Sequence, residues 1–250
     1  MTDQVNNPFN LPTERIDLPS KGLLYPTGHP LKEGFVEICY PTAKHEDILT
    51  NINYLRSNIA EEKFLEALLV TKFNMKDLLQ GDKDAIMLAA RILAYGKDYA
   101  FFSDKKRYTV DLTTLKEKSL DEALFKSGVN EFSFTLPIGK AVVTYKYLTL
   151  KDEDEIQKEE DGIKKIQPDY SAGTTLFLRQ SILSVNGDKE RSTIHKFVDR
   201  ILLQDAKALR KHIIETKPGI DMTTTAYGDK GEVVEGFRVP ITIDFFWPEY

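Results

Sequence analysis

In each half of this 250-residue chain the spacing of apolar residues switches from helical to alternating. This switch constrains the fold more than any other feature of the sequence. Apolar residues recur at helical spacing through about 44–97 and again through about 173–216. Segments of alternating apolar and polar residues, rich in Val, Thr and aromatic residues, follow at 107–113, 131–150 and 221–246. Helices and strands segregated in this way predict an α+β fold, built as two helical lobes with associated small antiparallel β hairpins.

The same pattern divides the chain into four segments. We expect an extended N-terminal arm (1–15), an N-terminal α+β lobe (16–125), a β-hairpin and acidic connecting segment (126–172), and a C-terminal helical lobe with a terminal β hairpin (173–250). Asp82 and Asp205 each precede an apolar helical run and are predicted N-caps. The halves also resemble each other in outline, with LLQGDKDAIMLAARIL (78–93) set against ILSVNGDKERSTIHKFVDRIL (182–202). Duplication and shared packing rules both account for this likeness.

Charge and hydropathy narrow the possible partners. The formal net charge is −5 and the isoelectric point is near 5.5, which argues against a broad phosphate-binding surface and so against nucleic acid as a partner. No apolar run reaches the roughly 18 residues that predict a membrane span, so no membrane partner is expected. The N-terminal segment lacks the basic start and apolar core of a signal peptide, which predicts a cytoplasmic location.

The sequence contains no constellation typical of catalysis or metal binding. Cys39 is the one cysteine, which excludes an intramolecular disulfide and a thiolate zinc cluster. The four histidines form no HExxH motif, and phosphate-binding glycine loops and a GxSxG motif are also lacking. We therefore predict no enzyme, no cofactor and no metal. The acidic run 151–161 leaves one alternative, a hydrolase that uses carboxylates such as Asp152 and Glu155, and a nucleic-acid-binding regulator is a second.

The candidate binding residues lie near the two ends of the chain. Large aromatic side chains crowd the last residues, and Trp and Tyr dominate the energetics of protein interfaces. The C-terminal aromatic segment can pack on its own lobe or dock on a partner. The loop and turn at 16–26 has the same two interpretations. The residues that we predict to bind a partner are Leu18, Pro19, Lys21, Gly22, Leu23, Tyr25, Phe245, Phe246 and Trp247.

Several of these segments also carry a family resemblance. LPSKGLLYPTGHPL (18–31), PTAKHEDILTN (41–51), LLQGDKDAIMLAARILAYGKDYAF (78–101) and VPITIDFFWP (239–248) resemble the baseplate protein family of T-even-like contractile phages. The resemblance runs in order along nearly the whole chain. It implies a non-enzymatic phage tail baseplate hub protein that acts as an assembly chaperone or a structural subunit.

The resemblance also implies partners and a location. The partners are other phage baseplate hub proteins, met in the host cytoplasm during assembly, and the virion tail baseplate is a further location. Some relatives carry cysteine pairs, suggestive of zinc, in the β segments after each helical block. The corresponding stretches here, 101–113 and 223–238, contain no cysteine. The resemblance carries no catalytic residue to this chain.

Overall fold

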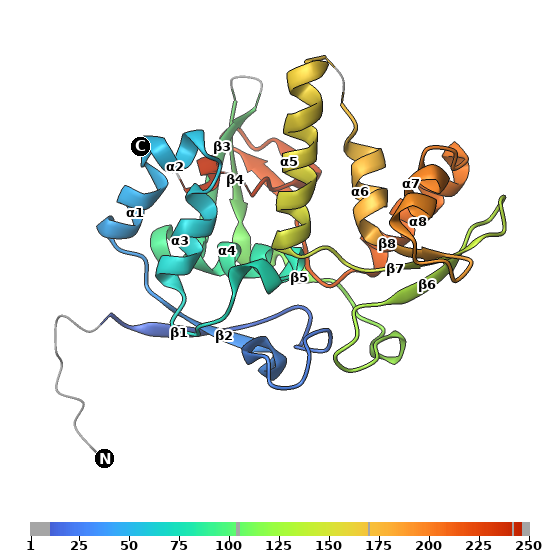
Figure 1. Ribbon diagram of the computed structural model, residues 1–250. Helices are drawn as coiled ribbons and strands as arrows, with labels where there is room; N and C mark the ends of the chain where they lie inside the picture. The colour runs from blue at the N-terminus through green and yellow to red at the C-terminus, as the bar shows by residue number, and fades with distance from the viewer. Residues whose placement is uncertain (1–10, 104–105, 170, 242, 247–250) are drawn as a thin grey trace.

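A computed structural model describes residues 11–241 and 243–246, apart from 104, 105 and 170 (Figure 1). It confirms an α+β fold, in which helices alternate with small antiparallel sheets. The sheet orders are β1-β2, β11-β10-β4-β3, β5-β9 and β6-β7-β8. Antiparallel sheets commonly bury one face and expose the other, as β2 does with buried Val36 and Ile38 on one face and exposed Glu37 on the other.

The first half of the chain begins with a hairpin and ends with another. Its elements are β1 (Thr13–Asp17), β2 (Phe35–Cys39), α1 (Ala43–Leu49), α2 (Ile52–Arg56), α3 (Ala60–Leu68), α4 (Gln80–Tyr95), β3 (Asp98–Ser103) and β4 (Lys106–Asp111). After α3, Leu69 forms an antiparallel bridge to Ile38 and so adds a short third strand to the first hairpin. Two 3-10 turns, Pro30–Glu33 and Met75–Asp77, lie between these elements.

The second half follows a short connection that contains β5 (Lys116–Glu117) and the 3-10 turns Leu112–Thr114 and Glu122–Leu124. Its elements are β6 (Phe132–Thr135), β7 (Val142–Tyr145), α5 (Leu150–Ile166), α6 (Gly173–Ser181), β8 (Ile182–Val185), α7 (Arg191–Val198), α8 (Leu203–Thr216), β9 (Ile220–Asp221), β10 (Thr223–Gly228), β11 (Val233–Arg238) and the 3-10 turn Ile243–Phe246. The acidic run therefore lies on a helix, α5.

Both halves repeat one order of elements. A hairpin is followed by helices, a third pairing segment, a further helix and a second hairpin, in residues 13–111 (the first unit) and 132–238 (the second unit). The second unit has the additional helix α7 and the short strand β9, and the first unit has only the 3-10 turn Met75–Asp77 at the place of α7. The likeness extends to sequence, because Tyr-Pro-Thr-Ala-Lys-His-Glu-Asp (40–47) matches Tyr-Leu-Thr-Leu-Lys-Asp-Glu-Asp (147–154) in place. Thr42 and Thr149 are equivalent N-caps, and each backbone N–H donates to the side chain three residues on, at 3.0 Å to His45 Nδ1 and 3.0 Å to Asp152 Oδ2.

A buried aspartate ties the last helix of each unit to the first hairpin of that unit. Asp82 Oδ1 accepts the Ser20 N–H at 3.0 Å, and Asp205 Oδ1 accepts the Ile138 N–H at 2.8 Å. Each turn follows a Leu-Pro pair whose leucine is buried, Leu18-Pro19 and Leu136-Pro137. The N-cap prediction for both aspartates is wrong, since Leu79 and Leu202 hold that position and the aspartates lie three residues inside. Helix α4 thus corresponds to α8, and not to the 182–202 segment that the sequence comparison suggested.

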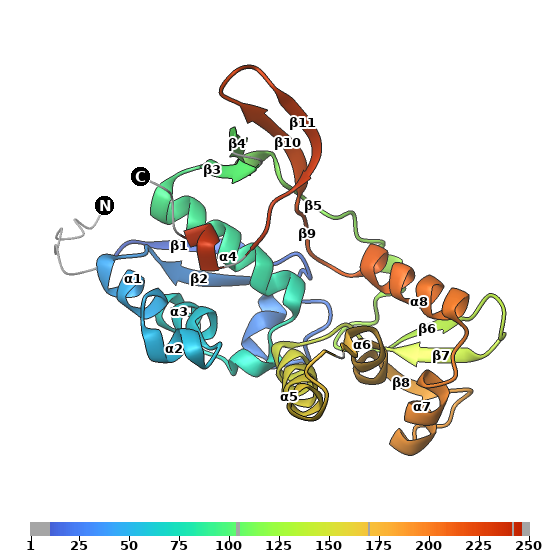
Figure 2. The same cartoon turned by 90° about the horizontal axis from the view of Figure 1, so that it is seen from above.

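The C-terminal hairpin lies on the first unit rather than on the helices that precede it. Tyr227 pairs with Thr109 and Gly228 with Tyr108, which joins β10 to β4 in one four-stranded sheet. Figure 2 shows β10 and β11 beside β3 and β4, away from α7 and α8. Strand pairing therefore connects the C-terminal hairpin to β4 of the first unit.

The two units also meet at the starts of α4 and α5. Leu79 forms an antiparallel bridge to Thr149, the Gln80 N–H donates to the Leu148 carbonyl at 3.3 Å, and the Leu150 N–H donates to the Leu78 carbonyl at 2.9 Å. We call this contact the unit junction.

Candidate interaction surface

The residues of the 18–25 turn that were predicted to bind a partner are mostly buried in the protein's own fold. Leu18, Pro19, Gly22 and Tyr25 are buried, Leu23 is half-buried, and Lys21 is exposed in an ion pair with Glu122 at 2.5 Å. The turn is fastened to α4, because Asp82 Oδ2 accepts hydrogen bonds from Ser20 Oγ and Tyr25 Oη, both at 2.7 Å. Their arrangement makes this segment part of the core, with Lys21 as its accessible side chain.

Burial shifts the pKa values of Asp82 and Tyr25, the side chains that hold the turn to α4. Burial raises the pKa of Asp82, against the hydrogen bonds from Tyr25 and Ser20 that favour its ionised form. Burial and the nearby Asp82 carboxyl also raise the pKa of Tyr25 above its ordinary value, so its hydroxyl stays protonated and donates. Ser20, Tyr25 and Asp82 do not line the cavity beside Gln80 and Lys217 or the hollow beside Glu62 and Lys76.

The predicted C-terminal anchors are core residues of the first unit. Phe245 is 0% exposed and Phe246 is 2% exposed. Phe246 packs against Phe64 at 4.8 Å between ring centroids, and Phe245 packs against Tyr99 at 5.1 Å. The buried guanidinium of Arg91 donates through Nε to the Phe245 carbonyl at 2.8 Å, which fixes the backbone here. Trp247 lies outside the described residues.

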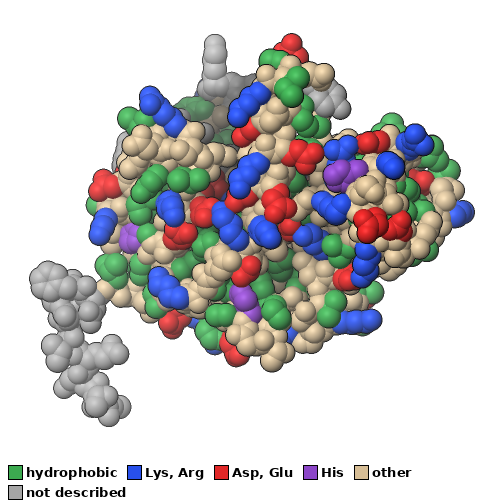
Figure 3. All heavy atoms as spheres, viewed as in Figure 1, with side chains coloured by type: hydrophobic (Ala, Val, Ile, Leu, Met, Phe, Trp, Pro, Cys, Tyr) green, Lys and Arg blue, Asp and Glu red, His purple; other side chains and the backbone are tan. Residues whose placement is uncertain are grey.

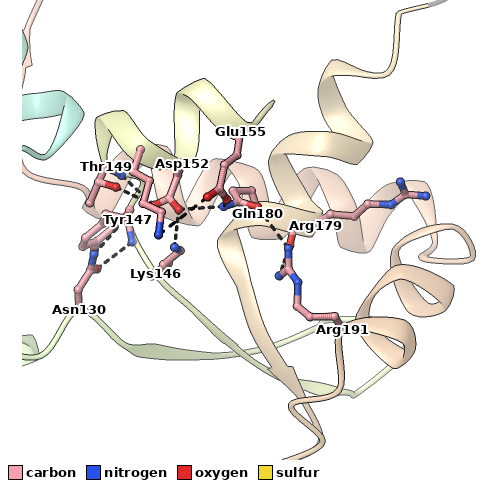
Figure 4. A network of polar contacts seen from close by, with 10 residues as sticks. Asn130, Lys146, Tyr147, Thr149, Asp152, Glu155, Arg179, Gln180 and Arg191 are labelled. Carbon is pink, nitrogen blue, oxygen red and sulfur yellow. Dashed lines mark hydrogen bonds and ion pairs between the residues drawn. The ribbon is translucent and has the colours of Figure 1, made fainter. Parts of the chain in front are cut away.

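The carboxylates of the hydrolase alternative belong to a helix-capping network (Figure 4). Asp152 is buried between Lys146 Nζ at 2.6 Å and Gln180 Nε2 at 2.8 Å, and it also accepts the Thr149 N–H. Burial raises the pKa of Asp152, but these donors outweigh it and hold the pKa below its ordinary value. A general acid needs the opposite shift. Glu155 is exposed and accepts a hydrogen bond from the same Gln180 side chain at 2.7 Å.

A second carboxyl pair, which the sequence analysis missed, lies near the unit junction. Burial raises the pKa of both Asp84 and Glu153, and the Asp84 charge raises that of Glu153 further. Burial also lowers the pKa of the neighbouring Lys217, whose ammonium donates to Gln80 Oε1 at 2.8 Å. Lys217 lines a cavity of about 40 Å³ with Gln80, Tyr147 and Phe177. That volume holds a few water molecules and no organic substrate.

Three of the exposed apolar side chains share one face of the four-stranded sheet. Phe102 on β3 is 56% exposed, Tyr227 on β10 is 59% exposed and Val233 on β11 is 56% exposed. Tyr227 pairs with both Val233 and Thr109, and Phe102 pairs with Arg107, so the alternation of side chains puts all five on one face. We call this set the outer face.

Charged side chains border the outer face, while aromatic packing fixes the opposite side of the same sheet. Arg107 pairs with Asp229 at 3.4 Å, and Lys106 pairs with Glu232 at 3.1 Å. Behind the sheet, Phe101 stacks on Phe237 at 4.1 Å. The outer face therefore combines three exposed apolar side chains with Arg107 and Thr109, and further charged side chains lie beside it. Asp98–Ser103 has four consecutive apolar residues and no alternation, so the sequence carries no clear signal of strand β3 beside the adjoining helix.

Three further findings bear on function. None of the helices described is both long enough and apolar enough to cross a membrane. Within the described residues, no three His, Cys, Asp or Glu side chains gather as metal ligands do. Figure 3 shows Lys, Arg, Asp and Glu side chains interspersed over the face in view, with the two signs mixed.

Comparison of the chain with profiles of known protein families, with curated proteins and with solved structures finds no match.

Proposed function

We propose that this chain is a non-enzymatic protein of a phage tail baseplate hub, which acts as an assembly chaperone or structural subunit by binding other hub components. One observation carries the proposal: the outer face presents Phe102, Tyr227 and Val233 on a rigid sheet. The motif resemblance at 18–31 and 78–101 supplies the class of partner.

The composition of the outer face suits protein recognition. Binding energy at interfaces concentrates in a few large side chains, with Tyr and Arg prominent, and a polar border excludes water around them. Tyr227 with Arg107 beside the same strand pair fits this pattern. The sheet holds these side chains in place before binding, which reduces the entropy lost on association.

The test is co-purification of this chain with hub proteins of the same phage. We expect the native chain to co-purify with a hub protein and the double variant Phe102→Ser/Tyr227→Ser to lose at least about tenfold in affinity, since each anchor contributes about 1–2 kcal/mol. Ile166→Ser is the matched control, because Ile166 is exposed at the end of α5, away from the sheet. Co-purification that is unchanged in the double variant would contradict the outer face as the binding site.

A further inference from the structure

The unit junction joins the start of α4 to the start of α5, and each of these helix starts has an equivalent in the other unit, at α8 and α1. In the part of the chain that the structure describes, the equivalent helix starts do not contact each other. In the first unit, Leu79 before α4 is 4% exposed because it bridges Thr149 of the second unit. Leu202 before α8 is the equivalent residue, and it is 51% exposed, with Leu203 beside it 79% exposed. The described residues offer no hydrogen-bond acceptor to the Leu203 N–H, whereas the equivalent Gln80 N–H reaches Leu148.

The opposite end of the chain presents the complementary half. Thr149, which receives Leu79, corresponds to Thr42 before α1. Leu150 is buried at the unit junction, but its counterpart Ala43 is exposed. The Leu150 N–H donates to Leu78, and the Ala43 N–H has no equivalent partner among the residues described.

Charge favours contact between these two unused halves. At the unit junction, Asp84 and Glu153 carry like charges and each is half-buried. Their counterparts by position in the units are Lys207 on α8 and Glu46 on α1, which are exposed and opposite in sign. The repulsion inside the chain thus becomes an attraction between one copy's second unit and another copy's first unit.

The placement of the two halves excludes contact within one chain. In Figures 1 and 2, α1 lies at one end of the molecule and the start of α8 lies at the other. Helices α4 and α8 start at the same end of their respective units. The start of α4 therefore lies next to α5 of the second unit, whereas the start of α8 lies on the side away from α5 (Figure 2). The units therefore follow one another head to tail, and a further unit would continue the series.

We propose that a second copy of this chain docks head to tail, with the Ile201–Leu203 backbone of one copy bridging the Pro41–Ala43 backbone of the next. The contact reproduces the unit junction between molecules, with Leu202 opposite Thr42 and Lys207 near Glu46. A head-to-tail contact of this kind is heterologous, so it builds a ring or an open filament rather than a closed dimer. The proposal goes beyond the proposed function and holds whatever binds the outer face.

Disulfide trapping tests the geometry directly. Antiparallel bridge partners have Cα atoms about 4.5–5.5 Å apart, within the range that a disulfide spans. In a Cys39→Ala background, a mixture of Leu202→Cys and Thr42→Cys chains should give a covalent dimer under mild oxidation, and the double variant should give a ladder. Leu79→Cys/Thr149→Cys is the matched control, which should close within one chain. An intrachain disulfide in the control without any dimer in the mixture would overturn the proposal.

Sedimentation over a range of concentrations tests the energetics without cysteines. Leu203→Glu should weaken self-association at least about tenfold, while Leu124→Glu, at an exposed leucine elsewhere, should leave it unchanged. Lys207→Glu and Glu46→Lys should each weaken it, and the double swap should restore it. A chain that stays monomeric at every concentration, or one whose association ignores all of these changes, contradicts the proposal.

Discussion

Gly81 lies in the first turn of α4, at the point where that helix passes the end of α8. A Cβ at this position would lie 2.0 Å from the Pro218 carbonyl oxygen, and backbone on both sides prevents easy relief. Gly81→Ala should therefore lower the free energy of unfolding by more than about 2 kcal/mol, through overpacking. Urea denaturation measures the change.

Gly162 provides the matched control for Gly81. It also lies in a helix, α5, but a Cβ there would meet no heavy atom within 4 Å. Gly162→Ala should raise the free energy of unfolding by about 0.5–1 kcal/mol, because alanine loses less backbone entropy in a helix. Equal effects of the two substitutions would show that Gly81 is not a site of close approach.

Single aspartates show where sequence reasoning succeeds and where it stops. Asp82 and Asp205 lie in the first turns of their helices, but the N-cap role predicted for them is wrong. Their partners, Ser20 and Ile138, lie more than sixty residues away along the chain. An aspartate before an apolar run has the same local signal whether it accepts its own helix's N–H groups or those of a distant turn. Only the tertiary fold distinguishes the two.

Among the elements, α5 shows how a strongly charged segment forms a stable helix. Its N-terminus carries the Thr149–Asp152 capping box, and Lys164 pairs with Glu160 one turn before the end at 3.1 Å. Acidic residues at the start and basic residues at the end both complement the helix dipole. The segment needs no bound cation to explain its charge pattern.

The Asp152 carboxylate gives this helix a defined pH dependence. Its folded-state pKa is below the unfolded value of about 3.9, so its contribution is complete above that pH and is lost as the pH falls through the folded value. Asp152→Asn should cost about 2 kcal/mol of unfolding free energy at pH 7 and progressively less below about pH 4. Chemical denaturation at pH 7 and pH 3 measures both values, with exposed Asp169→Asn as the control. A difference that persists undiminished at pH 3 would contradict this account.

Element prediction succeeded where one period ran long enough. The strands at 106–111, 132–135 and 142–145 and the helix α4 lie where alternation or helical spacing predicts them. Strand β8 was missed because Ile182–Val185 is only four residues long and follows α6 directly, so it is too short to show a change of period. Its pairing with β7, through Val143 and Val185, decides its conformation.

At the scale of the whole molecule, the two units are bound together by contacts that cross the chain midpoint. β10 pairs with β4, β9 pairs with β5, and Phe245 and Phe246 pack in the first unit. A protease site inserted between Lys126 and Ser127 should therefore give a nicked protein whose fragments co-elute on size exclusion and separate only in denaturant. Two separately folded species in native buffer would contradict this interdependence.

The division of the chain at 126–172 remains a prediction. Sequence reasoning did not predict the strand pairs that cross this region, β10 with β4 and β9 with β5. Strand partners are set by long-range register, which a composition or period does not encode. The likeness of the units was visible in outline but was aligned on the wrong helices, because the glycine-aspartate pairs at 81–82 and 187–188 occupy different places in the two units.

The filling of the first unit's core by Phe245 and Phe246 has a consequence for biosynthesis. Translation adds about 5–20 residues per second, and more than a hundred residues separate β4 from this aromatic pair. The interior of the first unit therefore stays open for several seconds after β4 is synthesised, until Phe245 and Phe246 have been added to the chain. A host chaperone that shields nascent apolar surface would find its longest-lived target there.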